Sequence, residues 1–443
     1  MVRSAQAIQW PPLKRPNIVW IYCDELRVDA LSCYGAATPG IETPALDSLA
    51  DSGQIFTNHF TNSPICVPAR AAVLSGLYPE QTGVYGNEGA WPGFRLSREV
   101  RTFTEMLADA GYATANFGKI HVPNEMRPFA HHNHEGGEMA AVAEPVREAG
   151  TRIITPEHVR TMIGGRFPAG VEFPPPPYDT LYASEPFRRG FTERKTSEFE
   201  RRFAEVTGPD ALSPEDVFLV QQYYYGLVRW IDDEVAQVVA ALEELRLRES
   251  TLLIFSADHG ASLGEGAAFA KHTFAPHVHR VPLILSWPGT LNPAERSDIA
   301  EAVDLAPTVL EACGRSAGAE MRGRNLLSQS SAEQVFATIG HGLDWTRAYP
   351  NMSGGTWRDG GGWPRRVCVR TPQYRLDCNV VRNGRPVPPE ERDVFFCDWN
   401  TDPLEAENRS GDAALGAVES QLLDAVLAHA ATGIDPASVV PRA

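Results

Sequence analysis

Two short apolar runs in the chain, residues 17–22 and residues 251–256, are each followed closely by charged positions. A continuous apolar run of this length is typical of a strand that is buried on both faces of a parallel sheet. The carboxyl end of such a strand reaches a crevice, where polar side chains gather. The pattern therefore places two polar sets at one edge of the predicted sheet: Asp24 and Glu25 after the first run, and Asp258 and His259 after the second.

A long amphipathic pattern precedes the second run and predicts a helix from residue 213 to about residue 247. Ser213 supplies an N-cap and Pro214 a first-turn proline, and acidic residues follow in the first turn. Residues 102–111 form a second predicted helix that ends in glycine, and residues 112–117 form the strand after it. This alternation of strand and helix indicates an α/β domain with a mostly parallel sheet.

The last part of the chain has a different pattern. Residues 366–377 predict two strands around a turn, and residues 393–396 predict a third strand. A final helix over about residues 413–431 is expected to pack on this small antiparallel sheet. We therefore expect two domains, a large α/β domain at residues 1–365 and a small α+β subdomain at residues 366–443.

Two segments are expected to be surface loops. The first, residues 167–178, contains four consecutive prolines, which lack backbone donors and exclude regular hydrogen-bonded structure. The second, residues 340–364, is rich in glycine and contains three tryptophans.

The composition narrows the class of protein. With 443 residues, 43% of them apolar and 22% charged, the chain can bury one large core and add a smaller domain. A formal net charge of −16 disfavours nucleic-acid partners, because such binding requires lysines and arginines that neutralise phosphates. Any bound anion must therefore enter a local basic pocket. Residues 1–16 contain no signal-peptide core and no apolar run is long enough to cross a bilayer, so we expect a soluble, cytoplasmic enzyme without membrane partners.

The seven cysteines form no C-x-x-C pair, which argues against a zinc site. Six of them are expected to be ordinary reduced thiols. The seventh opens the segment Cys66-Val67-Pro68-Ala69-Arg70 at the predicted start of a helix. Unpaired backbone N–H groups and the helix dipole favour an anion there, and Arg70, one turn further on, can point back to the same place. A buried structural cysteine is the alternative for this segment taken alone.

This segment, with Tyr78 and Pro79 downstream, resembles the C-x-P-x-R signature of the type I sulfatase family in the alkaline-phosphatase-like superfamily. In that family the cysteine is oxidised to formylglycine. Four further segments resemble family motifs, in the family's order and over nearly the whole chain: residues 16–35, 43–58, 117–121 and 258–285. The resemblance implies an alkaline-phosphatase-like α/β sandwich. Its parts are a large, mostly parallel mixed sheet flanked by helices and a small C-terminal antiparallel sheet packed with a helix.

The resemblance also implies a divalent metal held by residues from both strand ends and by the modified cysteine: Asp24, Glu25, Cys66, Asp258 and His259. Hard carboxylate oxygens suit Ca²⁺ or Mg²⁺ better than zinc. The resemblance favours calcium, with Mg²⁺ or Mn²⁺ as alternatives. Glu25 departs from the family, which more often has Asp there, and its extra methylene moves the carboxylate by about one bond length. Solvated acids are the alternative for either strand end alone.

A sulfate pocket lined by Arg70, Lys119 and Lys271 is implied as well, in which the three cations bind the non-bridging oxygens and offset transition-state charge. His121, in a G-K-x-H motif with Lys119, is expected to orient the nucleophile or handle a proton. A core histidine bonded to backbone is the alternative for it. The family's histidine that protonates the leaving group is not recognisable before the prolines. Its candidates are His131, His132, His134, His158 and His272.

The implied reaction is hydrolysis of a sulfate monoester. One hydroxyl of the hydrated aldehyde at residue 66 attacks sulfur and the alcohol leaves. The second hydroxyl then loses its proton, the C–O bond to sulfate breaks and the aldehyde is restored. The metal lowers the pKa of the attacking hydroxyl. The expected partners are an aryl, alkyl or sugar sulfate and a formylglycine-generating enzyme, and the oligomeric state is not predicted.

Two other functions stay open at this point. A phosphonate monoester or phosphodiester hydrolase of the same superfamily uses a similar nucleophile and metal site, so the core motifs separate these reactions weakly. A non-catalytic binding protein of the same fold is expected to lack part of the catalytic set, but Cys66, Arg70, Lys119 and Asp258 are all present. The glycine-rich loop holds side chains suited either to binding the leaving group or to filling the joint between the domains: Trp345, Arg347, Trp357, Arg358 and Trp363.

Overall fold

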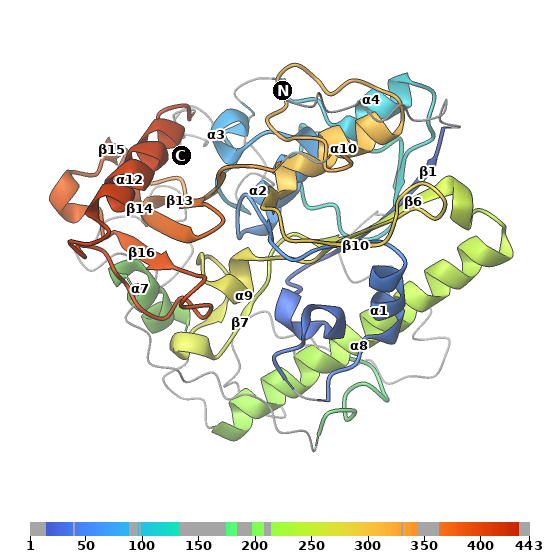
Figure 1. Cartoon of the computed structure of the whole chain (residues 1–443), viewed down its shortest axis with the longest axis horizontal. Coiled ribbons are helices and arrows are strands. Elements are labelled where there is room, and N and C mark those ends of the chain that lie inside the picture. The colour runs from blue at the N-terminus through green and yellow to red at the C-terminus, as the bar shows by residue number, and fades with distance from the viewer. Residues whose placement is uncertain are drawn as a thin grey trace, which may run out of the picture.

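A computed structural model of the chain describes most of its residues. The described ranges are 15–38, 40–87, 96, 99–132, 174–183, 197–207, 214–328, 331–343 and 363–433. They form two five-stranded sheets with helices packed on them, and the C-terminal elements lie to one side of the larger assembly (Figure 1).

The larger part of the molecule is organised around a mixed sheet with strand order β1-β6-β9-β2-β10. Its strands are β1 (Asn17–Cys23), β6 (Thr251–Ala257), β9 (Leu283–Ser286), β2 (Gln54–Phe56) and β10 (Ala294–Arg296). β1 and β6 pair in parallel over their whole length. β2 and β10 are also parallel, whereas β9 runs antiparallel to both β6 and β2. The two strands predicted from apolar runs are therefore direct neighbours, and their carboxyl ends lie side by side.

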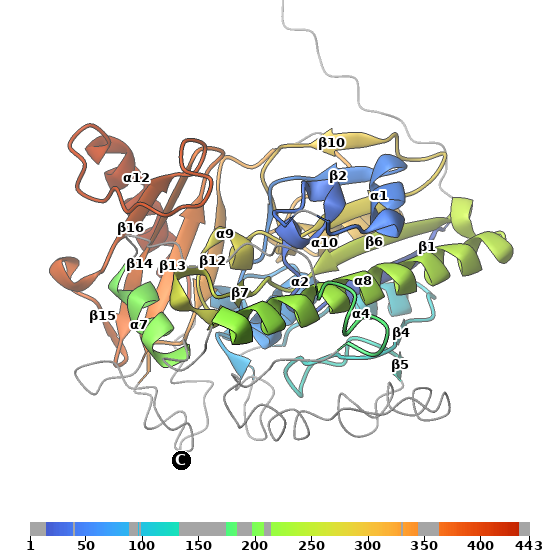
Figure 2. The same ribbon diagram turned by 90° about the horizontal axis from the view of Figure 1, so that it is seen from below.

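Helices cover both faces of this sheet (Figures 1 and 2). On one face lie α2 (Cys66–Ser75), α4 (Phe103–Asp109) and α10 (Leu305–Ala312), and on the other α1 (Pro44–Asp51) and the long α8 (Pro214–Glu244). In β6, Leu252 and Ile254 pack with the first group, whereas Leu253 and Phe255 pack with the second. Side chains alternate across a strand, so a strand covered on both faces must be apolar throughout.

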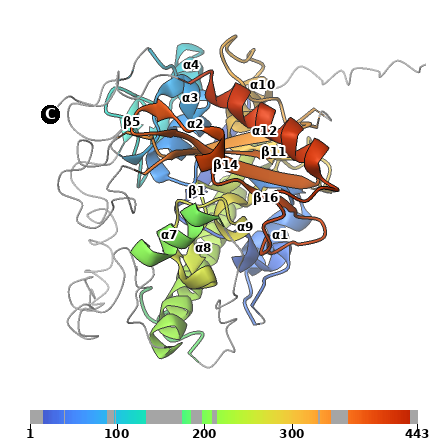
Figure 3. The ribbon, with the colours of Figure 1, turned by 90° about the vertical axis from the view of Figure 1, so that its left-hand side faces the viewer.

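The C-terminal sheet is antiparallel, and the helix α12 (Gly416–Ala430) packs on it (Figure 3). Its strands are β12 (Val335–Ile339), β13 (Arg365–Arg370), β14 (Tyr374–Arg382), β15 (Arg385–Pro386) and β16 (Phe395–Asp398). The helix α12 buries Leu422 and Val426 against Val367, Val369 and Leu376. The first strand of this sheet, β12, lies before residue 366, where the sequence analysis places the start of the second domain. The domain boundary at residue 366 stays a prediction.

The remaining elements are short and connect or flank the sheets. They are β3 (His59–Phe60), β4 (Ala115–Asn116), β5 (His131–His132), β7 (Ser262–Leu263), β8 (Phe269–Ala270), β11 (Ala300–Glu301), α3 (Pro79–Thr82), α7 (Glu198–Thr207) and α9 (Pro276–His279). In the described ranges, 3₁₀ turns lie at Val28–Ala30, Ser32–Tyr34, Arg248–Ser250, Glu265–Ala267, Ala302–Asp304 and Pro389–Glu391.

The fold predicted from the sequence is confirmed, with its mixed central sheet and its small antiparallel sheet carrying a helix. The predicted helices at 213–247 and 102–111 correspond to α8 and α4, and the strand expected over 112–117 is reduced to β4. Residues 174–178 lie outside helices and strands, as expected for the predicted loop at 167–178, whereas residues 167–173 and most of the glycine-rich loop lie outside the described residues. Among the described helices, none is long and apolar enough to cross a membrane.

Candidate active site

The parallel pairing of β1 and β6 brings Asp24 and Asp258 together, one at the end of each strand. Asp258 is fully buried, and its carboxylate accepts hydrogen bonds from the backbone N–H groups of Glu25 at 3.1 Å and His259 at 2.9 Å. The backbone of Gly260 then packs closely against α9, where a Cβ would lie only 2.0 Å from the carbonyl oxygen of His277. A side chain at that position would push the backbone outward, so the glycine keeps His259 in the site.

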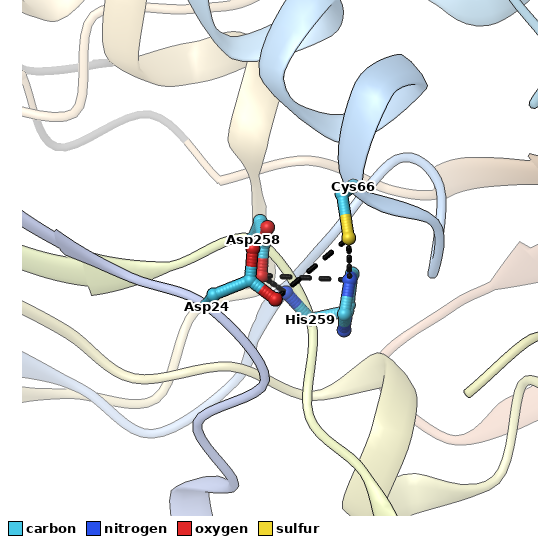
Figure 4. Close-up of side chains that lie close together, drawn as sticks. All are labelled: Asp24, Cys66, Asp258 and His259. Atoms are coloured by element: carbon cyan, nitrogen blue, oxygen red, sulfur yellow. Dashed lines mark hydrogen bonds and ion pairs between the residues drawn. The ribbon is translucent and has the colours of Figure 1, made fainter. Parts of the chain in front are cut away.

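Cys66 is the first residue of α2, and its side chain points at these strand ends (Figure 4). Its Sγ lies 3.3 Å from Nε2 of His259 and 3.7 Å from Oδ1 of Asp24. Lys271 approaches from another segment and places its Nζ 2.9 Å from the same sulfur. The thiol is 2% exposed, so the nucleophile predicted from the sequence lies in a closed, polar pocket.

Four of the five predicted metal ligands converge on one point. Ligand atoms of Asp24, Cys66, Asp258 and His259 all lie within 4.8 Å of one another (Figure 4). Two carboxylates with an imidazole form a donor set that fits a divalent cation, and the oxygens suit calcium or magnesium. Glu25 differs, because its carboxylate contacts the ammonium group of Lys271 and is not one of the four.

The three predicted cations surround this cluster. Arg70 is 4% exposed, and it donates from Nε to Asp258 at 3.1 Å and from Nη2 to Asp24 at 2.9 Å. Its remaining terminal nitrogen donates to the backbone carbonyl of Lys119 at 3.1 Å, while Nζ of Lys119 lies 3.1 Å from Asp24. Lys271 lies 3.9 Å from the same aspartate. The positive groups therefore balance the carboxylates of Asp24 and Asp258 and leave an environment in which a further anion can be held.

The electrostatics of the cluster follow from this arrangement. Burial alone would raise the pKa of the Cys66 thiol, but hydrogen bonds with His121 and His259 lower it to about 7. Burial also opposes ionisation of Asp24, yet its cationic neighbours hold its pKa well below the usual range. For His259 burial lowers the pKa, but the Asp258 carboxylate outweighs it and raises the pKa to about 9. The pocket thus favours a negatively charged group at residue 66.

Three residues of the site have a left-handed backbone that is uncommon outside glycine: Glu25 (φ 57°), His121 (φ 45°) and His272 (φ 77°). Such residues cluster where the surrounding structure imposes the conformation, often at active sites. In His272, burial and then the charges of Lys271 and His259 lower the pKa to about 3, so its imidazole is neutral. Its ring packs against Phe203 of α7, with centroids 5.8 Å apart.

The other predicted residues have different outcomes. Of the leaving-group candidates, His131 and His132 form β5, and the side chains of these two and all of His134 and His158 lie outside the described residues. Trp345, Arg347, Trp357 and Arg358 lie outside them as well. Trp363 is described, and it packs edge-on against Phe199 and Phe203 of α7 at 5.5 and 6.4 Å. This contact fits the joint-filling alternative for that tryptophan.

Sequence reasoning missed residues that brace the site. Asn87 accepts a hydrogen bond from the backbone N–H of Val67 at 3.1 Å and so caps the helix that Cys66 opens. Arg27 forms ion pairs with Asp29 at 2.6 Å and Glu265 at 2.5 Å, which join the segments after β1 and β6. No local pattern marks these contacts, because each links positions that are distant in the sequence or belong to irregular loops.

Comparison with known proteins gives a consistent result. A family model described as Sulfatase matches residues 16–128 and 173–315, which is more than half of the chain. The ulvan-active sulfatase of Formosa agariphila is 26% identical over 364 residues, which cover 74% of this chain and 57% of that protein. The chain therefore spans little more than half of that relative. The delta 4,5-hexuronate-2-O-sulfatase of Bacteroides thetaiotaomicron is 24% identical over 436 residues, covering 90% of this chain and 85% of that one.

Solved structures share the fold. A phosphonate monoester hydrolase from Silicibacter pomeroyi has a TM-score of 0.74 at 20% identity, covering 95% of this chain and 96% of that chain. A 2-O GAG sulfatase has a TM-score of 0.67 at 20% identity, covering 94% and 93% of the two chains. The match of the family model, the fold and the arrangement around Cys66 together show that this chain belongs to the type I sulfatase family of the alkaline-phosphatase-like superfamily.

Proposed function

We propose that the chain hydrolyses a sulfate monoester through a formylglycine formed from Cys66, with the help of a divalent metal ion. The observation that carries this proposal is the convergence of the Cys66 sulfur, the carboxylates of Asp24 and Asp258 and three cations in one polar pocket. Such a pocket serves a reaction in which an anionic group is attacked and negative charge moves between oxygens.

Residue 66 stands at the centre of the proposed reaction. The hydrate of a formylglycine supplies one hydroxyl that attacks sulfur and a second that lets sulfate leave with restoration of the aldehyde. The side chains already around Sγ, Lys271 at 2.9 Å and His259 at 3.3 Å, would hold and orient that hydroxyl. His121 hydrogen-bonds to the thiol from the other motif and is the proposed partner for its proton.

The proposed metal ligands are Asp24, Asp258, His259 and residue 66, with Glu25 as a fifth candidate. Calcium is the proposed ion, with Mg²⁺ or Mn²⁺ as alternatives. When bound, it would lower the pKa of the hydroxyl on residue 66 and offset charge on a sulfate oxygen. Arg70 holds two of the carboxylates in place, whereas Lys119, with 27% of its side chain exposed, is the cation most open to an incoming sulfate.

Protonation of the leaving group is not assigned. His272 lies beside Lys271, but its pKa of about 3 keeps it neutral at physiological pH, and a neutral imidazole is a weak acid.

For the substrate class we propose a sugar sulfate, with aryl and alkyl sulfates as alternatives. The support comes from the names of the two relatives described above, one an ulvan-active sulfatase and the other a delta 4,5-hexuronate-2-O-sulfatase. A formylglycine-generating enzyme is the proposed partner for maturation.

A second function is favoured by one observation, namely the TM-score of 0.74 to a phosphonate monoester hydrolase. Side-by-side turnover of an aryl sulfate, a sugar sulfate, a phosphonate monoester and a phosphodiester by the same modified preparation tests both. We expect the highest kcat/KM for a sulfate ester. A higher kcat/KM for the phosphonate monoester would replace the proposed function by the alternative.

A further inference from the structure

Two arginines of the C-terminal sheet face each other across neighbouring strands, at the start of a buried polar network. Arg370 ends β13 and pairs directly with Arg375 of β14, and both are at most 1% exposed. Like charges placed opposite each other destabilise a sheet unless they are compensated. Glu405 compensates them: its carboxylate lies 2.6 and 2.9 Å from two nitrogens of Arg370 and 2.7 Å from Nη1 of Arg375.

Arg370 also reaches out of its own sheet into the catalytic part of the molecule. Its Nη2 donates to the carbonyl oxygen of Phe274 at 2.9 Å, and its Nε donates to Nδ1 of His279 at 3.0 Å. Phe274 belongs to the lysine segment, residues 271–274, which begins with Lys271 beside the Cys66 sulfur. Phe274 itself is 1% exposed and belongs to the same buried hydrophobic cluster as Ile65, the residue before Cys66.

His279 extends this contact to a second segment of the site. A guanidinium group can only donate, so Nδ1 of His279 accepts and Nε2 carries the proton. Nε2 lies 3.0 Å from the carbonyl oxygen of Thr61, which starts the nucleophile segment, residues 61–66. Burial, and then the charge of Arg370, lower the pKa of His279 well below its usual value, so the ring stays neutral in this relay.

The two segments are also joined to each other. The backbone N–H of His272, in the lysine segment, donates to the carbonyl oxygen of Pro64, in the nucleophile segment, at 3.2 Å. Within the nucleophile segment, Oγ1 of Thr61 donates to the carbonyl oxygen of Ser63 at 2.9 Å. One guanidinium group therefore holds both the segment that ends in Cys66 and the segment that presents Lys271.

We infer that Arg370 is a positioning residue for the reaction: it sets the relative placement of Cys66 and Lys271 through Phe274 and His279, without touching either. The expected effect of Arg370 on kcat rests on the proposed function. Its expected effect on the placement of the two segments does not depend on the substrate. It assigns the C-terminal sheet a part in assembling the active site.

Arg375 provides a matched control. It is equally buried and shares Glu405, but its other hydrogen bonds go to Asp377 at 2.7 Å and Glu200 at 3.0 Å. Among the hydrogen bonds of the described residues, those of Arg375 reach neither the lysine segment nor the nucleophile segment. A substitution at either position removes a buried guanidinium group. Only a substitution of Arg370 also removes the hydrogen bonds to Phe274 and His279.

The experiment compares Arg370→Lys with Arg375→Lys in the full chain, co-expressed with a formylglycine-generating enzyme. Lysine keeps the charge but cannot reach three separate acceptors in a fixed plane. With a small aryl sulfate we expect Arg370→Lys to lower kcat by roughly 10- to 100-fold while KM changes by less than about threefold. We expect Arg375→Lys to stay within about threefold of the wild-type kcat at the same folded fraction.

Hydrogen exchange gives a readout that needs no substrate. We expect faster amide exchange in residues 61–66 and 271–279 of Arg370→Lys, and no such change in Arg375→Lys. If Arg370→Lys does not fold, His279→Gln is measured instead. It removes the hydrogen bond from the His279 ring to the carbonyl oxygen of Thr61 and keeps the ion pair between Arg370 and Glu405. Equal kcat and equal exchange in the two arginine variants would overturn the inference. If the wild type turns over no sulfate ester, the proposed function fails and exchange alone decides the role of Arg370.

Discussion

At the scale of single residues, the site is built from side chains whose identities are visible in the sequence but whose contacts are not. Asp24, Cys66, Asp258 and His259 converge from two strand ends and one helix start, and their role as metal ligands stays a prediction. Glu25 shows the limit of that reasoning. Its left-handed backbone turns the carboxylate onto Lys271, and nothing in the residue pattern indicates a positive φ for a glutamate.

This difference predicts unequal effects of two neighbouring substitutions. Asp24→Asn removes a charged ligand from the four-membered cluster and should abolish binding of the divalent ion and nearly all turnover. Glu25→Gln should weaken ion binding much less, because its carboxylate pairs with Lys271, while kcat still falls as that lysine loses its partner.

Calorimetric titration of calcium, with metal content measured on the same protein, separates the two cases. Asp298→Asn is the control, since its carboxylate pairs with Arg296 away from the cluster. An equal loss of calcium affinity in Glu25→Gln and Asp24→Asn would make Glu25 a full ligand and contradict the distinction.

At the scale of elements, strands and helices with a strong local signal were predictable. β1, β6, α4, α8 and α12 follow from apolar periodicity, caps and glycine stops, since each depends on interactions within a few residues. Elements that are stabilised by residues distant in the sequence could not be predicted in this way. The helix α7 is capped by Asp393, which accepts hydrogen bonds from the backbone N–H groups of Glu198 and Phe199 at 2.8 Å each. This contact comes from the segment just before β16, so no sequence pattern near α7 indicates it, although Ser197 also caps the helix locally by accepting a hydrogen bond from the backbone N–H of Glu200 at 3.2 Å.

The cap can be tested with Asp393→Gly, because Asp393 itself has a positive φ of 50° that glycine adopts without strain. We expect a loss of at least about 1–2 kcal/mol in the free energy of unfolding, the usual cost of removing an N-cap, because the substitution also removes the contact of Asp393 with Arg366 at 3.2 Å. Asn383→Gly, at an exposed turn residue with φ 52°, controls for the added backbone freedom and should cost less than about 0.5 kcal/mol. Urea unfolding measures both, and equal losses would show that Asp393 does not stabilise α7.

At the scale of the whole molecule, the C-terminal sheet is tied to neighbouring segments through buried charged side chains. Arg366, Arg370 and Arg375 are among the largest fully buried side chains, and Glu405 and Asp377 lie with them. The residue pattern around 366–377 predicts strands, but arginines in a strand suggest a solvated face. They are buried because their partners come from other elements, as when Arg375 pairs with Glu200 of α7.

This network predicts a specific loss of stability in acid. Burial opposes ionisation of Glu405, but Arg370 and Arg375 lower its pKa from 4.5 to about 2. A carboxyl group with a lowered folded-state pKa contributes stability that is fully present above pH 4.5 and is lost as the pH falls toward 2. We therefore compare the difference in unfolding free energy between the wild type and Glu405→Gln at two pH values. This difference should be about 3 kcal/mol larger near pH 6 than near pH 2. Chemical denaturation across this range checks it, and a constant difference would mean that Glu405 keeps an ordinary pKa.

The central claim is that catalysis depends on a modified residue 66. The most direct measurement uses preparations expressed with graded amounts of a formylglycine-generating enzyme, in which mass spectrometry gives the fraction of aldehyde at residue 66. The turnover of a sulfate ester is then measured on the same samples. We predict that kcat rises in proportion to the aldehyde fraction, extrapolates to zero for the unmodified thiol and is absent in Cys66→Ala. Full turnover of a sulfate ester by protein whose Cys66 is entirely an unmodified thiol would contradict the account.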